Sequence, residues 1–389
     1  MNFSTRTAWE LEENDFAAAL RAIRATGQEP IDLTVSNPTV CGFTYCDSEL
    51  LAPLSSASAL HYVPDPLGMV SARQGVAKYY RDHDAEVSLD RICLTTSTSE
   101  AYSFLFRLLC DSGDEVLIAR PSYPLFDYIA RLDEVRLQEY PLLYDPHHGW
   151  MIDIHSLEAR ITPRTRAVIV VHPNNPTGNF VSTTEREKLE EICLRHGMAL
   201  IVDEVFLDYA LEGVIAQSFT TASPQVLTFV LSGLSKICGL PQMKASWIAA
   251  CGPESTVGEA MARLEVIADT YLSMNAPIQS ALPPWLENRY GLQQQIRERM
   301  TANLAALEAR LRGSPAQRLE MQGGWTVVLR VPRTLDGKPF AFAALDRGVL
   351  VQPGDFYGLP EGRAVLSLLT PPEQWQLGLA QLPLEDPQA

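Results

Sequence analysis

The stretch QVLTFVLSGLSK, residues 225–236, ends an apolar run on serine and glycine and then places a lysine, Lys236. The run 227–231 is short, mostly apolar and rich in valine and leucine, which is typical of a buried strand. A lysine just after such a strand is costly to bury unless its ammonium is paired, or its nitrogen is neutral or covalently engaged. The stretch therefore predicts a core strand that presents a lysine with a specific task.

Further apolar runs resemble this one and alternate with helical patterns. The other expected strands are 115–119, 167–171, 199–203 and 247–251. The clearest helical patterns are 99–109 and 184–197, the second of which ends at a glycine. This alternation predicts an α/β fold whose large domain contains a mainly parallel, helix-flanked sheet.

The pattern changes from about residue 286. A long helix is expected over 292–312 and strands over 325–331 and 364–369, which together predict a smaller α+β domain. An N-terminal helix and the segment 31–38 are expected to join it. The predicted organisation is an N-terminal segment over 1–45, a large ligand-binding domain over 46–285 and a small C-terminal domain over 286–389.

Composition narrows the class of ligand. The formal net charge of −16 over 389 residues opposes non-specific binding to nucleic acid and to anionic membranes. No apolar stretch approaches the roughly 18 residues that a membrane-spanning helix needs. The seven cysteines are scattered without a C-x-x-C pair, so we expect reduced thiols in the cytoplasm and no metal site. An anionic small molecule would need locally placed cations.

Polar residues follow the ends of several expected strands. Asp203 ends one strand, HPNNPTG (172–178) follows a second, RPSYP (120–124) follows a third and Lys236 follows a fourth. In open α/β sheets ligands bind beyond the carboxyl ends of the strands. TTSTSEA (95–101) leads into a helix, whose capped N–H groups would also bind phosphate. Each motif alone has a plainer explanation as a turn or a cap, but together they predict one site.

These residues resemble the class I and II aminotransferases, which are pyridoxal-phosphate enzymes of the aspartate aminotransferase fold. The resemblance runs from IDLTVSNPT (31–39) to GVLVQPGDFYG (348–358). It rests on NNPTG, the strand-end aspartate, and a serine–lysine pair with a second cation eight residues later. It implies transfer of an amino group between an amino acid and a 2-oxo acid, with pyridoxal 5'-phosphate held as a Schiff base on Lys236. Lys236 would then move the proton between the substrate and the cofactor.

The resemblance also assigns roles around the cofactor. Asp203 would keep the pyridine nitrogen protonated, because a nearby carboxylate raises the pKa of a base. Asn175 would donate to the phenolic oxygen, and Tyr123 would stack on the ring. The phosphate would be bound by Thr98, Ser99, Ser235, Lys244 and Tyr62. Tyr62 would reach the phosphate from a partner subunit, which implies a homodimer with shared active sites.

Two positions depart from the family pattern. Phe206 stands where a tyrosine usually contacts the phenolic oxygen, and Val365 stands where an arginine usually binds the substrate's α-carboxylate. Two explanations remain open: Arg363, two residues away, reaches the site, or the substrate presents no free carboxylate there, with Asn37 contributing to recognition. The second departure also leaves open a lyase, racemase or cyclase of the same fold, acting on an unusual amino substrate.

Overall fold

The computed structural model describes residues 1–9, 11–221, 224–331 and 339–384. Within these residues the largest sheet has eight strands. They are β2 (Ile92–Thr95), β3 (Glu115–Arg120), β4 (Arg136–Asp145), β5 (Gly149–Ile152), β6 (Thr165–Val171), β7 (Ala199–Asp203), β8 (Thr228–Gly233) and β9 (Ser246–Cys251). Their order across the sheet is β2-β9-β8-β7-β6-β3-β4-β5.

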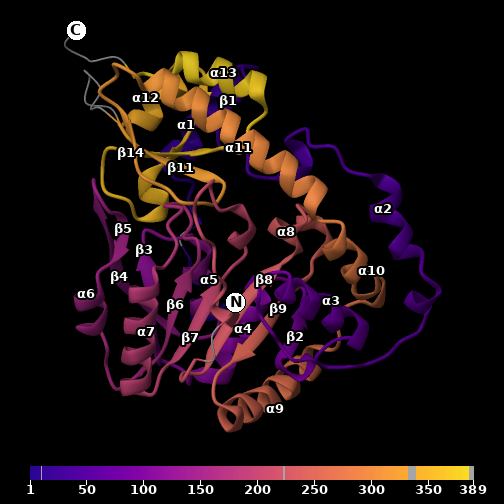
Figure 1. The fold of residues 1–389 in the computed structure, drawn as a ribbon. Helices are drawn as coiled ribbons and strands as arrows, with labels where there is room; N and C mark the ends of the chain where they lie inside the picture. Colours follow the sequence, from indigo (N-terminus) through magenta and orange to yellow (C-terminus); the bar gives the residue numbers. More distant parts are fainter. Residues whose placement is uncertain (10, 222–223, 332–338, 385–389) are drawn as a thin grey trace.

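The middle of this sheet is parallel and its edges are antiparallel. β4, β3, β6, β7 and β8 pair in parallel, whereas β9 pairs antiparallel with both β8 and β2, and β5 pairs antiparallel with β4. The parallel strands therefore bring their carboxyl ends to one edge, which faces the smaller sheet in Figure 1. That common edge is why residues far apart in the sequence can meet there.

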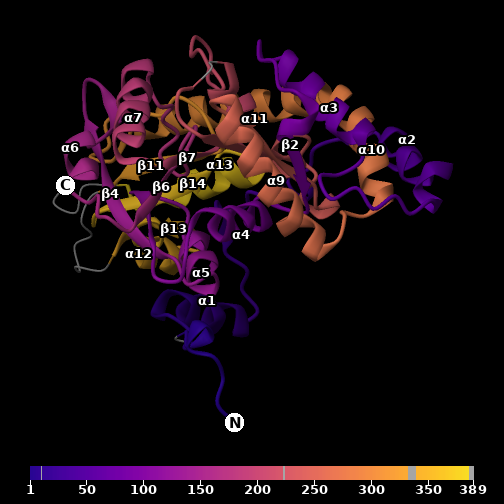
Figure 2. The same cartoon turned by 90° about the horizontal axis from the view of Figure 1, so that it is seen from below.

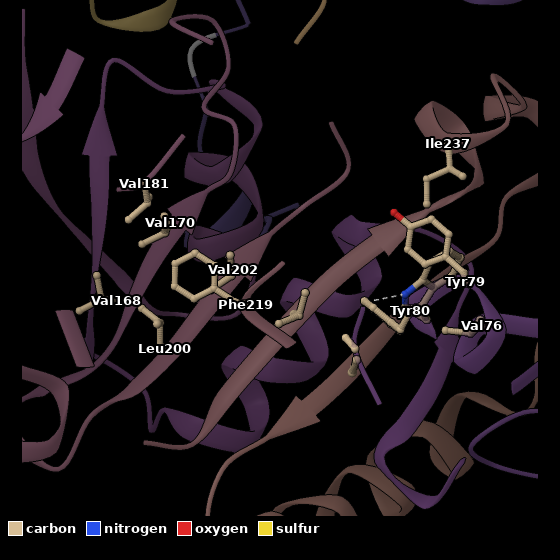
Figure 3. Close-up of a cluster of buried hydrophobic side chains, with 14 of the residues drawn as sticks. Val76, Tyr79, Tyr80, Val168, Val170, Val181, Leu200, Val202, Phe219 and Ile237 are labelled. Carbon is tan, nitrogen blue, oxygen red and sulfur yellow. Dashed lines mark hydrogen bonds between the residues drawn. The ribbon is translucent and has the colours of Figure 1, made fainter. Parts of the chain in front are cut away.

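The central strands are apolar on both faces because helices cover both. Along β6, Val168 and Val170 join one hydrophobic cluster, while Ile169 and Val171 join the cluster on the opposite face. This alternation follows from the period of two along a strand. Figure 3 shows Val168 and Val170 beside residues of β7 in the first cluster. A strand buried on both faces reads as a continuous apolar run, which is the pattern that the sequence contains.

The surrounding helices complete these layers. They are α2 (Asp47–Leu51), α3 (Val70–Arg81), α4 (Thr98–Leu109), α5 (Leu125–Leu132), α6 (Ile154–Glu158), α7 (Thr183–His196), α8 (Leu234–Ile237), α9 (Glu254–Tyr271) and α10 (Ala276–Glu287). Buried residues of α3, α7 and α10 belong to one cluster, and those of α4, α5 and α9 belong to the other. α7 begins with a capping box between Ser182 and Glu185 and ends at Gly197, whose φ of 63° favours glycine.

A second group of elements surrounds the small sheet, shown at the top of Figure 1. It contains α11 (Tyr290–Leu311), α12 (Phe340–Asp346), α13 (Pro372–Gln381), β10 (Gln317–Arg318), β11 (Thr326–Arg330), β13 (Gln352–Pro353) and β14 (Arg363–Ser367). The strand order β10-β11-β14-β13 is antiparallel throughout.

The N-terminal segment packs with this second group. β1 (Ile31–Asp32) pairs in parallel with β12 (Val349–Leu350), and Phe16 of α1 (Asp15–Ala25) belongs to the same hydrophobic cluster as β11 and β14. Residues before α1 extend along α5, where the Arg131 guanidinium donates to the backbone oxygens of Thr5 and Ala8. Figure 2 shows the chain start projecting beyond α1 and α5.

The predicted fold class is confirmed: a mixed, mostly parallel large sheet is accompanied by a small antiparallel sheet with helices. All five predicted buried strands are present, although β9 runs antiparallel to its neighbours. The domain limits at residues 45 and 285 stay a prediction, and part of the segment 286–389 lies outside the described residues. Among those described, no helix combines the length and apolarity needed to cross a membrane. All seven cysteines are free thiols, and the cytoplasmic compartment stays a prediction.

Candidate active site

A cavity of about 440 Å³ lies where the carboxyl ends of β6, β7 and β8 meet the small sheet. Eight residues predicted from the sequence line it: Thr98, Ser99, Tyr123, Asn175, Asp203, Ser235, Lys236 and Lys244. They come from the ends or connections of six elements of the large sheet and its helices. The expectation that strand ends converge on one site therefore holds for these eight residues.

Lys236 lies in α8, the single helical turn that follows β8. Burial lowers the pKa of its amine to about 8, against the opposing effect of the nearby Asp203 carboxylate. Its Nζ lies 4.9 Å from the centre of the Trp325 ring and 5.3 Å from that of Phe206. A lowered pKa makes a larger fraction of the amine neutral near pH 7, and the neutral amine is the nucleophilic form.

Asp203 ends β7, which pairs with β8, the strand that leads into α8 and Lys236. Burial raises the pKa of its carboxyl to about 6, while hydrogen bonds from the Val205 backbone N–H and the Tyr102 hydroxyl act in the opposite direction. The Val205 nitrogen lies 3.1 Å from Oδ1 of Asp203, and the Tyr102 hydroxyl oxygen lies 3.0 Å from Oδ2. A buried carboxylate held in this way has a strong preference for a positively charged neighbour.

The N-terminus of α4 forms a third side of the cavity. Ser97 caps this helix by accepting a hydrogen bond from the Glu100 backbone N–H at 3.1 Å, and the Glu100 carboxylate accepts from the Thr96 N–H at 2.6 Å. Thr98 and Ser99 then contribute the first helical N–H groups and two hydroxyls. Helix N-termini of this kind attract anions through their free N–H groups and their dipole.

Lys244 and the close approach of β8 to β9 complete the anion-binding end of the cavity. Lys244 lines the cavity from a left-handed backbone conformation with φ 53° and ψ 58°. Ser235 and Ser246 line the same cavity. At Gly233 an added Cβ would lie 2.3 Å from the Ser246 Oγ, so only glycine allows β8 and β9 to approach this closely here. The combination of hydroxyls, helix N–H groups and one ammonium suits a phosphate group.

Asn175 lies in the loop that follows β6. Its side-chain oxygen is buried and has no hydrogen-bond partner among the described residues. The side-chain oxygen of the neighbouring Asn174 is likewise buried without a partner among these residues, but its amide donates to the Pro121 backbone oxygen and to the Thr177 hydroxyl. Of the two asparagines, Asn174 therefore holds the loop together, and Asn175 is the one available to a ligand.

The opposite side of the cavity comes from the C-terminal part of the chain. We call this surface the C-terminal wall; it consists of Trp325, Thr326, Gln352, Tyr357, Leu366 and Ser367. All six side chains are uncharged. Gln352 and Tyr357 lie in GVLVQPGDFYG (348–358), which carries part of the family resemblance, but none of the six residues was predicted to belong to the site.

Three residues predicted from the sequence do not line the cavity. Asn37 caps a short helical turn, where its side-chain oxygen accepts from the Thr39 N–H at 3.1 Å. Tyr62 is 73% exposed on the segment between α2 and α3. Arg363 starts β14 directly opposite Arg330, and its Nη1 donates to the backbone oxygen of Gly362.

The register of β14 explains the position of Arg363. Val365 pairs with Val328 and Gln352 and is buried in the cluster on the large sheet, whereas Leu366 and Ser367 line the cavity. Arg363, Val365 and Ser367 share one face of β14 by the period of two, and of these three Ser367, at the end of the strand, lines the cavity. An arginine at Val365 would therefore enter a packed core rather than the cavity as it is lined here.

Comparison with known proteins agrees with this geometry. The model of the family described as aminotransferase class I and II matches residues 29–375. The chain belongs to the class I and II aminotransferase family. Over 263 residues it is 27% identical to the glutamate-pyruvate aminotransferase AlaA of Escherichia coli K12, covering 67% of this chain and 64% of AlaA. The alanine aminotransferase of Mycobacterium bovis is 29% identical over 262 residues, which are 67% of this chain and 61% of that protein.

The aligned region thus spans somewhat less than two thirds of these curated relatives. Solved structures extend the likeness over the whole fold. Alanine aminotransferase from Pyrococcus furiosus superposes with a TM-score of 0.87 at 22% identity, covering 98% of each chain. A Thermus thermophilus aspartate aminotransferase variant gives 0.83 at 23% identity, also over 98% of each chain. At these identities the likeness establishes the aminotransferase fold.

Members of the class I and II aminotransferase family use pyridoxal 5'-phosphate. The donor set of this cavity fits that group: Lys236 offers an amine for the aldehyde, and Asp203 a carboxylate for the ring nitrogen. The α4 N-terminus with Lys244 offers an anion site for the phosphate, and Asn175 lines the cavity with an amide group that can donate to the phenolic oxygen. The fit rests on the chemistry of these side chains in the structure itself.

Proposed function

We propose that this chain is a pyridoxal-phosphate-dependent aminotransferase, which moves an amino group from an amino donor to an oxo acceptor. The observation that carries the proposal is the placement of Lys236 and Asp203 at the ends of neighbouring strands in one cavity with an anion-binding end. Family membership supports it, and the relatives' names give glutamate, pyruvate and alanine only for those proteins.

Lys236 and Asp203 have different roles in the proposed reaction. Lys236 would hold the aldehyde covalently until the amino group of the substrate takes its place, and the Nζ freed in this way can take a proton from the amino-bearing carbon of the substrate and return one. Asp203 holds the ring nitrogen protonated, because a carboxylate favours a cation beside it. When bound, pyridoxal phosphate supplies an electron sink for the negative charge on that substrate carbon.

The remaining residues position the cofactor. Thr98, Ser99, Ser235 and Lys244 bind the phosphate through N–H groups, hydroxyls and one ammonium. Asn175 donates to the phenolic oxygen. Tyr123, which is 45% exposed at the cavity, stacks on the ring. Phe206 cannot form a hydrogen bond, so Asn175 carries that contact without the help of a tyrosine at position 206.

The test of the proposed function is a half-reaction. The chain loaded with pyridoxal phosphate is mixed with a panel of amino donors, and the cofactor's absorbance is followed. An aminotransferase is expected to convert the cofactor to its aminated form, which an oxo acceptor then restores. A lyase, racemase or cyclase returns to the starting spectrum with the donor alone, so that outcome would replace the proposed function.

We further propose that two copies form a homodimer with shared sites. Leu60, Tyr62 and Val63 are 87%, 73% and 53% exposed on the segment between α2 and α3, and Val70 follows at 51%. An apolar surface of this kind is typical of a contact with another chain. Sedimentation velocity is expected to give twice the chain mass of 43.1 kDa. A single species at that chain mass at micromolar concentration contradicts the dimer.

A further inference from the structure

We propose that the C-terminal wall selects amines and carbonyl compounds that have an aromatic or apolar body and no carboxylate on the reacting carbon. The inference rests on the proposed function and concerns the substrate class of the same site. It chooses between the two explanations that the sequence left open for the missing arginine. The argument begins with the position of the wall relative to Lys236.

The wall borders the reacting nitrogen. Trp325 is only 1% exposed, and its ring centre lies 4.9 Å from Lys236 Nζ. Its orientation is fixed by T-shaped contacts with Phe206 at 5.4 Å and with Tyr209 at 5.0 Å. A substrate whose carbon is joined to the cofactor beside Lys236 must therefore place one of its substituents against Trp325 or its neighbours in the wall.

The polar groups of the wall are neutral and partly committed. The Thr326 hydroxyl donates to the backbone oxygen of Pro176 at 3.0 Å. The Ser367 hydroxyl accepts from the Leu369 N–H at 3.3 Å. Gln352 accepts a hydrogen bond from the Tyr357 hydroxyl, which leaves its amide N–H groups as donors. Leu366, which is 1% exposed, adds apolar surface.

The cations that this chain brings to the cavity are already in use. Within the described part of the chain, Lys236 and Lys244 are the cations that line it. The first bonds the aldehyde and the second the phosphate. Arg363 shares a face of β14 with Ser367 but stands four residues away, roughly 13 Å at 3.3 Å per residue, does not line the cavity, and lies opposite another arginine, Arg330. A carboxylate against the C-terminal wall would thus find neutral donors, whose hydrogen bonds are about half as strong as charge-assisted ones.

This charge balance favours substrates without a carboxylate on the reacting carbon. A carboxylate loses its hydration on entering the cavity, and neutral donors restore only part of that loss. An aromatic or alkyl group loses nothing comparable and gains contact with Trp325, Tyr357 and Leu366. The reaction balances without further reactants: the amine gives up its amino group and the hydrogen on its carbon and gains a carbonyl oxygen, while a second carbonyl compound gives up its oxygen and receives the amino group and the hydrogen.

The first measurement is binding, which does not depend on turnover. The chain loaded with pyridoxal phosphate is titrated by calorimetry with 3-phenylpropanamide and with 3-phenylpropanoate, which differ chiefly in charge and have no amino group. We expect the amide to bind at least about tenfold more tightly, since one charge-assisted interaction is worth roughly that factor. Equal or tighter binding of the carboxylate overturns the inference.

Matched variants of Thr326 test the mechanism of selection. This residue is only partly buried and faces the cavity, so a longer side chain has room. Thr326→Arg is expected to tighten binding of 3-phenylpropanoate at least about tenfold, whereas Thr326→Gln, of similar length without charge, is not. Gln352 is also partly buried and lines the cavity from β13, so Gln352→Arg, with Gln352→Met as the uncharged control, repeats the test if a Thr326 variant fails to fold. Unchanged binding of the carboxylate in the folded arginine variants contradicts the role of the wall.

A spectroscopic arm separates this inference from the proposed function. 2-Phenylethylamine and phenylalanine differ only by the carboxylate. We expect 2-phenylethylamine to aminate the cofactor at least about tenfold faster, because the carboxylate of phenylalanine finds no charge-assisted partner at the C-terminal wall. Faster reaction of phenylalanine overturns the inference and leaves the aminotransferase intact. If no donor changes the cofactor spectrum, the proposed function fails, while the binding measurements still decide the selectivity of the wall.

Discussion

Lys236→Ala is expected to abolish the covalent capture of pyridoxal phosphate and to lower turnover by about 10³-fold or more, the contribution of a positioned acid–base group. In the parent chain, borohydride reduction should fix the cofactor to the peptide that contains Lys236, as seen by mass spectrometry. Only this lysine and Lys244 line the cavity within the described residues, and Lys244 stands at the anion-binding end.

Lys244→Ala is the matched control for this experiment. It removes the other cavity ammonium and should weaken cofactor binding while leaving the reduced adduct on Lys236. An adduct on Lys244 in the Lys236→Ala variant would mean that the two lysines have been assigned the wrong way round. An adduct on neither lysine in the parent chain would remove the chemical basis of the proposed function.

The pH dependence of capture follows from the pKa of Lys236, which burial lowers to about 8. The amine is protonated below this pKa and neutral above it, so capture should speed up as pH rises and level off above about pH 9. From pH 7 to 9 the neutral fraction rises about tenfold for a pKa of 8, but about a hundredfold for an ordinary lysine near 10.4. The reaction of Nα-acetyl-lysine, which has a free ε-amine, with pyridoxal phosphate is measured in parallel and corrects for the titration of the cofactor itself.

The sequence could predict the centre of the fold because local pattern and global position agree there. β6 and β7 are covered on both faces, so nearly every residue is apolar and the strands are visible as continuous runs. Their ends are equally visible, since Asp203 ends the run of β7 and HPNNPTG (172–178), which contains Asn175, follows the run of β6 directly. The residues of the cavity that belong to the large sheet follow directly from these two signals.

The C-terminal wall could not be predicted in the same way. Leu366 lines the cavity and Val365 does not, yet both are apolar and adjacent, and only the pairing of β14 with β11 and β13 decides between them. A shift of one residue along a strand exchanges the two faces. For the same reason the position of an arginine could not be transferred reliably from the family pattern to this chain.

Trp325 could not be predicted to line the cavity for a different reason. An aromatic residue that begins a strand is usually part of a hydrophobic core, and Trp325 does belong to one. Its second role depends on where the two sheets face each other, which is a tertiary property that no local pattern carries. The contact with Lys236 joins residues 89 positions apart, from Lys236 to Trp325.

Asp203→Asn is expected to lower turnover by about a hundredfold or more while leaving the fold and much of the cofactor affinity. The change removes a charge from a buried site, where a fixed charge stabilises a reacting group far more than it does in water. The structure tolerates the amide, because asparagine can still accept from the Val205 N–H and the Tyr102 hydroxyl can accept as well as donate. Stopped-flow measurement of the half-reaction checks the rate, and the cofactor's absorbance checks occupancy.

Glu204 provides the matched control, since it is the next residue and is also a buried carboxyl whose pKa burial raises, here to about 7. Its side chain points elsewhere, accepting from the Ser218 hydroxyl at 2.7 Å and the Phe219 N–H at 2.6 Å. Glu204→Gln should therefore affect stability more than turnover. If Asp203→Asn turns over at nearly the parent rate with cofactor bound, or if both variants lose activity equally, the charge at position 203 is not what sustains the reaction. A loss confined to Asp203→Asn ties the chemistry to the one carboxylate that ends β7 beside Lys236.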